Sequence, residues 1–74
     1  MYELWDFDSA NIVNAYPTES AALAVVVAQM DAYGRAAVAT WVLLKDDGGP
    51  DKLPVAEGDA LADLAIRQRV AAGD

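Results

Sequence analysis

The stretch Thr18–Ala24 (TESAALA) recurs without gaps as Ala56–Ala62 (AEGDALA), 38 residues further along the chain, with four of the seven positions identical. In each copy the stretch follows strand-forming residues and begins a run of helix formers. The sequence therefore predicts an internal duplication, with repeat 1 over about residues 1–36 and repeat 2 over about residues 37–74.

Repeat 1 has the pattern of a β-hairpin followed by a helix. Tyr2–Phe7 is rich in aromatic residues and Ile12–Tyr16 in apolar ones, so both segments favour strands joined by a turn. Thr18 is a suitable helix N-cap, and Gly34 is suited to the position just after a helix. We therefore expect the first helix over Glu19–Tyr33.

Repeat 2 has the same pattern. Ala37–Lys45 is nearly all apolar, which predicts a strand buried on both faces. Residues 46–51 have the composition of a turn, and Lys52–Ala56 predicts a short strand. Pro54 favours an edge position for this strand, because proline cannot donate a hydrogen bond to a neighbouring strand. The second helix is expected to begin near Gly58.

Together the repeats predict one α+β domain over residues 1–74. The two β-β-α repeats would form a four-stranded antiparallel sheet with both helices on one face, related by a pseudo-twofold axis. The chain has no cysteine, so no disulfide can reinforce a core of this size. Self-association is one way in which such a small domain can be stabilised.

Composition narrows the classes of function. The chain carries 12 acidic and 5 basic residues, for a net charge of −7, which argues against nucleic acid or an anionic membrane as partner. The residues after Met1 form neither the basic nor the apolar segment of a secretory signal, and no apolar run is long enough for a bilayer, so we expect a cytoplasmic protein.

Residue types that usually carry catalysis are scarce. Histidine and cysteine, the usual base, nucleophile and zinc ligands, are both absent. Asp6 and Asp8 have the spacing with which a calcium loop begins, but the central glycine is missing and Pro17 stands where the bidentate glutamate belongs. We expect a non-enzymatic protein that needs no metal or other cofactor.

The first helix is apolar on nearly every side. A stripe at helical spacing should face the sheet: Leu23, Val26, Val27, Met30 and Tyr33. The opposite side is apolar as well, and a helix that is apolar all round is normally buried all round. One interpretation is a dimer or larger assembly in which Val25, Ala28 and Ala32 contact a second copy. The alternative is that these alanines are surface-tolerant helix formers and only Val25 is out of place.

Two further surfaces could bind a partner. Acidic residues gather at both predicted hairpin tips and could dock a basic protein, although solvated turns would look the same: Asp6, Asp8, Asp46, Asp47 and Asp51. Trp5 and Phe7 alternate with Tyr2 and Leu4, so some aromatic surface should lie on the sheet face away from the helices.

The opening segment Tyr2–Asp6 (YELWD) resembles that of short uncharacterised bacterial proteins with a β-β-α repeat. That resemblance covers most of the chain and implies a bacterial protein, but it brings no assigned function. The junction Ala15–Glu19 is also similar to that of HicB-type antitoxins, whose helix follows a strand through a Thr and a Glu-Ala-Leu run. Here Ser20–Leu23 replaces that run, and the antitoxins' C-terminal DNA-binding segment has no counterpart.

From these features we expect a small protein-interaction module that self-associates. The alternative is an acidic inhibitor or antitoxin-like protein that neutralises a basic partner.

Overall fold

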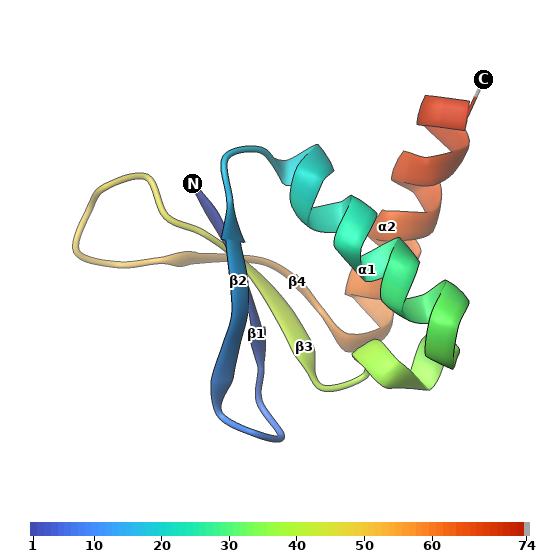
Figure 1. Cartoon of the computed structure of the whole chain (residues 1–74). Helices are drawn as coiled ribbons and strands as arrows, with labels where there is room; N and C mark the ends of the chain where they lie inside the picture. Colours follow the sequence, from blue (N-terminus) through green and yellow to red (C-terminus); the bar gives the residue numbers. More distant parts are fainter. Residues whose placement is uncertain (74) are drawn as a thin grey trace.

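Four β-strands and two α-helices make up the computed structural model, which describes residues 1–73 (Figure 1). In chain order the elements are β1 Tyr2–Asp6, β2 Asn11–Tyr16, α1 Glu19–Tyr33, the short 3-10 helix η1 Arg35–Val38, β3 Trp41–Lys45, β4 Leu53–Glu57 and α2 Gly58–Gly73. Two β-β-α units follow one another, as the α+β prediction requires.

The four strands form one antiparallel sheet in the order β2-β1-β3-β4. The first strand of each hairpin is therefore central and the second lies at an edge. Leu4 lies opposite Leu43 at the middle of the central pair, with Tyr2 opposite Lys45 at one end and Asp6 opposite Trp41 at the other. The predicted four-stranded antiparallel sheet is confirmed, and β4, which contains Pro54, is an edge strand.

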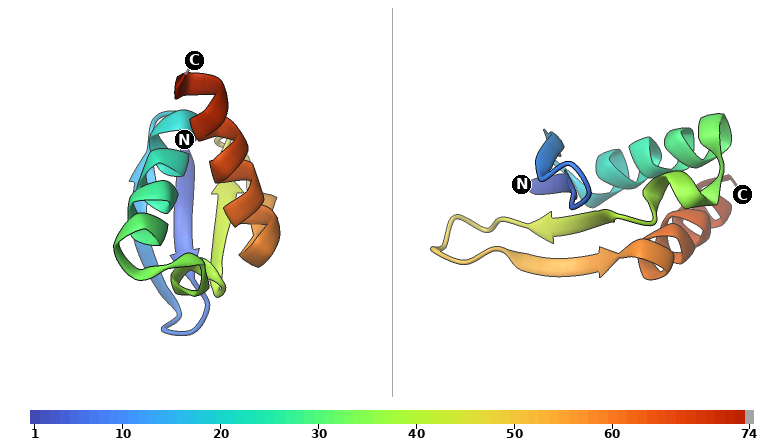
Figure 2. Two further views of the ribbon diagram at one scale, coloured as in Figure 1. Left: turned by 90° about the vertical axis from the view of Figure 1, so that its right-hand side faces the viewer. Right: turned by 90° about the horizontal axis from the view of Figure 1, so that it is seen from below.

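Both helices cover the same face of the sheet, as the left view of Figure 2 shows. The core lies between these two layers and is built from apolar side chains of every layer: Leu4, Trp41 and Leu43 from the sheet, Val38 from η1, Ala22, Leu23 and Val26 from α1, and Leu61, Ala62 and Ala65 from α2. Val42 is also buried but lies outside this cluster, because it pairs with Trp5 on the other face of the sheet.

The central strands and the helices of the two units are 39 positions apart, since β1 and β3 begin at Tyr2 and Trp41, and α1 and α2 at Glu19 and Gly58, whereas the edge strands begin 42 apart. The sequence alignment, at 38, is one residue short of this spacing. Each edge strand also has a β-bulge where it pairs with its central neighbour. The extra residue, which has no partner in the central strand, is Val13 in β2 and Val55 in β4. The duplication itself stays a prediction.

Helix α1 has the predicted bounds, and its ends show why. The Thr18 side chain accepts a hydrogen bond from the Ala21 N–H at 3.1 Å, and the Gly34 N–H donates to the Met30 carbonyl at 2.7 Å. These contacts satisfy groups that the first and last turns leave without helical partners. The stripe expected to face the sheet is wrong at one position: Tyr33 lies at the last turn and is 75% exposed.

The strand predicted over Ala37–Lys45 is wrong in its first half. Ala37 and Val38 belong to η1, and the strand begins only at Trp41. Val38 is fully buried nevertheless, so the apolar run correctly indicates burial. A short apolar run cannot by itself distinguish a strand from a buried helical turn.

Candidate functional site

The three residues of α1 proposed for self-association differ in how exposed they are. Ala28 and Ala32 are exposed, as the prediction needs. Val25 is half-buried and packs against the core, so it does not point away from the rest of the domain. On the side proposed for self-association, the exposed residues are therefore alanines, which carry little contact area.

The two acidic hairpin tips lie at opposite ends of the sheet. Asp6 ends β1 and pairs with Trp41 at the start of β3, whereas Asp46 follows Lys45 at the end of the same strand. Five residues of β3 span roughly 14 Å at the usual rise of a strand. Asp8 thus lies at one tip, Asp47 and Asp51 lie at the other, and the structure does not bring the two groups together.

Several of these carboxylates already bind their own turns. Asp46 Oδ1 accepts the Gly48 N–H and Asp47 Oδ1 the Gly49 N–H, each at 3.0 Å. Asp6 Oδ1 accepts from the Thr40 hydroxyl at 2.7 Å and from the Asp8 N–H at 2.9 Å. The Thr40 hydrogen bond is the main cause that lowers the pKa of Asp6. The three contacts to backbone N–H groups two residues further on are typical of side chains that shape turns, whereas the Thr40 contact joins Asp6 to the residue before β3.

The sheet face away from the helices carries a small polar cluster that sequence reasoning missed. Glu3 Oε1 accepts hydrogen bonds from the Trp5 indole N–H and the Lys52 ammonium, both at 2.8 Å. The ammonium also lies 5.6 Å from the centre of the Trp5 ring, within range of a cation–π contact. Lys52 lowers the pKa of Glu3, and Glu3 raises the pKa of Lys52.

This cluster explains how a charged residue can lie within the sheet. Glu3 is only 8% exposed, and its carboxylate is hydrogen-bonded on a face that also holds Val42, Leu44 and, opposite Val42, Glu57. Trp5 is half-buried beside them, as the alternation with Leu4 predicted. Phe7 lies beyond the end of β1 and is 63% exposed, so it is not part of the strand expected there.

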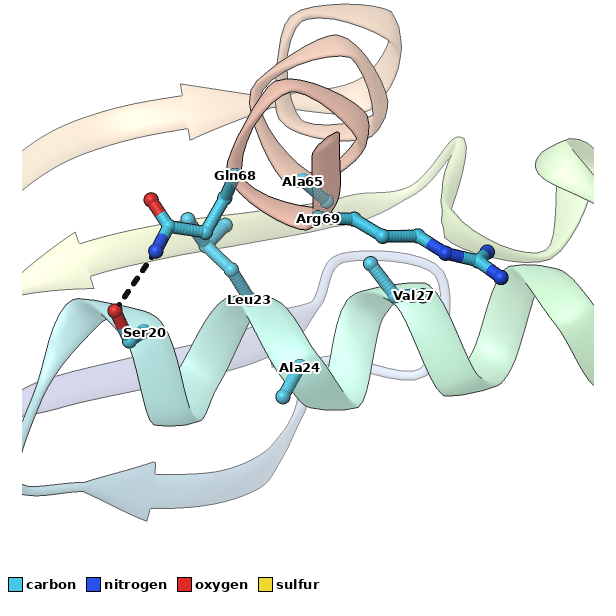
Figure 3. Close-up of a pocket in the computed structure, with 7 residues that line it drawn as sticks. All are labelled: Ser20, Leu23, Ala24, Val27, Ala65, Gln68 and Arg69. Atoms are coloured by element: carbon cyan, nitrogen blue, oxygen red, sulfur yellow. Dashed lines mark hydrogen bonds between the residues drawn. The ribbon is translucent and has the colours of Figure 1, made fainter. Parts of the chain in front are cut away.

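A shallow groove of about 410 Å³ runs between α1 and α2 (Figure 3). Leu23, Val27 and Ala65 form its apolar part, and Ser20 and Gln68 meet across it in a 2.9 Å hydrogen bond. Arg69 lies along the groove and pairs with Asp31 of α1 at 3.0 Å. The polar groups at its rim therefore serve to join the two helices.

Among residues 1–73, no group of three acidic, histidine or cysteine side chains is placed to hold a metal ion. The helices in the described part of the chain are also too short or too polar to cross a bilayer.

Comparisons with known proteins identify no relative. No protein-family model matches the chain, and neither the curated proteins nor the solved structures give a significant match.

Proposed function

We propose that this chain is a small, non-enzymatic protein-interaction module that associates with itself. The observation that carries the proposal is the one-sided layering of the fold. Two helices cover one face of the sheet, and the remaining surface carries large apolar side chains on both edge strands: Ile12 and Val13 on β2, and Leu53 and Val55 on β4. Apolar surface of this kind is a common feature of protein contacts.

Helix α2 adds to this surface. Its Ile66 and Val70 side chains are 42% and 62% exposed. With a net charge of −7, the chain is kept soluble while these groups stay open to a partner.

Sedimentation velocity over about 5–500 µM protein tests the proposal, because self-association makes the apparent mass depend on concentration. We expect the mass to rise above 7.8 kDa within this range. A mass that stays at the monomer value at every concentration, at both low and high salt, would contradict self-association.

A charge placed on α1 tests the originally predicted interface. Ala28→Glu adds a carboxylate on the exposed side of the helix, whereas Val25→Glu would bury one against the core and unfold the domain for a different reason. If α1 is the interface, Ala28→Glu lowers the apparent mass. An unchanged mass moves the interface elsewhere.

The second candidate is an acidic inhibitor or antitoxin-like protein that binds a basic partner. This second proposal is favoured because three of the five basic residues already form ion pairs with acidic side chains within the fold: Arg35, Lys52 and Arg69. The loop after β3, with Asp46, Asp47 and Asp51, would be the docking tip. Binding to a basic protein should weaken as added salt shortens the Debye length.

A further inference from the structure

The two edges of the sheet are protected to different degrees. Edge strand β4 contains Pro54, ends at Glu57 and follows Lys52, and proline and charge are common devices against pairing with another chain. Edge strand β2, Asn11–Tyr16, has no proline and no charged residue, and its first five residues are exposed. The structure therefore has one edge protected by proline and charge, and one edge that lacks both.

Backbone contacts of the central strands show which groups of β2 face outward. The Phe7 N–H donates to the Thr40 carbonyl, and Met1 and Asp46 exchange hydrogen bonds, so odd-numbered residues of β1 are turned toward β3. In an antiparallel sheet, groups alternate between the two neighbours. The β2 residues opposite Glu3 and Trp5 must then point their N–H and C=O groups away from β1.

Those residues are Ala15, opposite Glu3, and Ile12, opposite Trp5. The same alternation places the nitrogen of Pro54, opposite Leu44, on the free edge of β4, where a missing N–H costs nothing. Ile12 in β2 corresponds to Pro54 in β4, because each is the residue just before the unpaired residue of its β-bulge.

One outward group of β2 is already occupied. The Ala15 N–H donates to the side-chain oxygen of Asn14 at 2.8 Å. This contact agrees with the outward direction of Ala15, and it covers a donor that a neighbouring strand would otherwise use. Asn14 thus competes with any strand that pairs at this edge.

We infer that β2 is the self-association site: it pairs antiparallel with β2 of a second copy once Asn14 releases Ala15, so that the two sheets become one. This inference rests on the proposed function and names its surface. A strand that pairs with its own copy forms a twofold, self-complementary contact. Because β2 is uncharged, two copies meet there without like charges in the contact, and the exposed Ile12 and Val13 side chains of both become covered.

The contact is small, so the association is weak. A pair of six-residue strands buries less than the roughly 1,200 Å² of a stable complex. Each copy also carries a net charge of −7, which opposes approach over a distance. Added salt screens this repulsion and strengthens the dimer, whereas it would weaken docking to a basic protein.

Matched lysine substitutions on the two edges test the site. Ile12→Lys and Leu53→Lys change residues that are 46% and 54% exposed, and each reduces the net negative charge by one. We expect Ile12→Lys to weaken association measured by sedimentation at least about 10-fold, and Leu53→Lys to change it less than about 2-fold. Asn14→Val, which frees the Ala15 N–H, should strengthen it about 3-fold or more.

The outcomes separate the inference from the proposed function. If the parent associates and the two lysine variants associate equally well, the β2 site is wrong and self-association stands. If the parent and Asn14→Val are both monomeric throughout, both proposals fail.

A measurement on the parent protein needs no variant and covers the case in which Ile12→Lys fails to fold. Amide hydrogen exchange by NMR at low and high protein concentration should show slower exchange of Ile12 and Ala15 at high concentration. Exchange rates at these two amides that do not depend on concentration, in protein whose mass does rise, would overturn the inference.

Discussion

The two β-β-α units have the same order of elements but fill the core with side chains of opposite size. At matched positions near the start of each helix, α1 has Ala22 and Leu23 where α2 has Leu61 and Ala62. All four are at most 1% exposed. A large side chain in one unit is thus matched by a small one in the other, which lets the two helices pack closely in a single core.

The two units thus share an order of elements and differ in which matched position carries the large side chain. Strict repetition would give two leucines or two alanines at each matched pair, and so would overfill or underfill the space between the helices. The predictions below test this complementarity, beginning with the largest expected effect.

Leu23→Ala should lower the free energy of unfolding by roughly 2–5 kcal/mol, because it leaves a cavity in the shared core. Urea denaturation measures the loss, and Ala28→Ser on the exposed side of α1 is the control, expected to stay within about 0.5 kcal/mol.

The double variant Leu23→Ala with Ala62→Leu sharpens the comparison, since it moves the large side chain to the matched position in α2. If the two units complement each other, the double variant regains part of the lost stability. A double variant less stable than Leu23→Ala alone would mean that the matched positions do not share one space.

Much of this fold could be predicted from the sequence, because the local sequence signals for helix ends and strands agree with how these elements pack in the domain. Thr18 and Gly34 fix the ends of α1 through backbone contacts that any helix end requires. Pro54 indicated an edge strand for a reason that holds in any sheet. The apolar run from Ala37 failed as a strand because burial, which it does indicate, is common to strands and helical turns.

The candidate sites were harder to predict, because they depend on contacts between distant residues. Asp6 and Asp46 look alike in sequence, but the antiparallel pairing of β1 with β3 places them at opposite ends of the sheet. Lys52 precedes β4 and reaches Glu3 of β1 across β3, and no local pattern in the sequence indicates that contact. Val25 packs on the core through neighbours that the helical period alone does not reveal.

The two helices also differ in how they begin. α1 begins after the Thr18 cap, whereas α2 begins directly after β4 at Gly58, whose φ is +56°. A Cβ at Gly58 would lie 3.2 Å from the Ala39 carbonyl oxygen. Gly58→Ala should therefore lower the free energy of unfolding by roughly 1–2 kcal/mol from the left-handed backbone alone, and by more from this contact.

Gly48→Ala is the matched control for Gly58→Ala in the same denaturation experiment. Gly48 has a φ of +90°, but a Cβ there would meet nothing within 4 Å. Its cost should reflect backbone strain without the clash. A cost of Gly58→Ala no greater than the roughly 1–2 kcal/mol of the left-handed backbone would mean that the approach of Ala39 to the start of α2 contributes nothing.

The last and smallest effect concerns the open face of the sheet, where the matched positions are Glu3 in β1 and Val42 in β3. Lys52 lowers the pKa of Glu3 in the folded protein, so Glu3 contributes stability above its unfolded pKa of about 4.3, and loses it as pH falls through the lower, folded pKa. Glu3→Gln should therefore reduce stability at pH 7, while at about pH 3 the difference from the parent should shrink.

Val42→Ala, at the matched position, removes no titrating group and should cost the same at both pH values. Urea denaturation of the three proteins at the two pH values decides the point. A loss for Glu3→Gln that is equal at both would mean that the stability comes from packing of the side chain rather than from its charge.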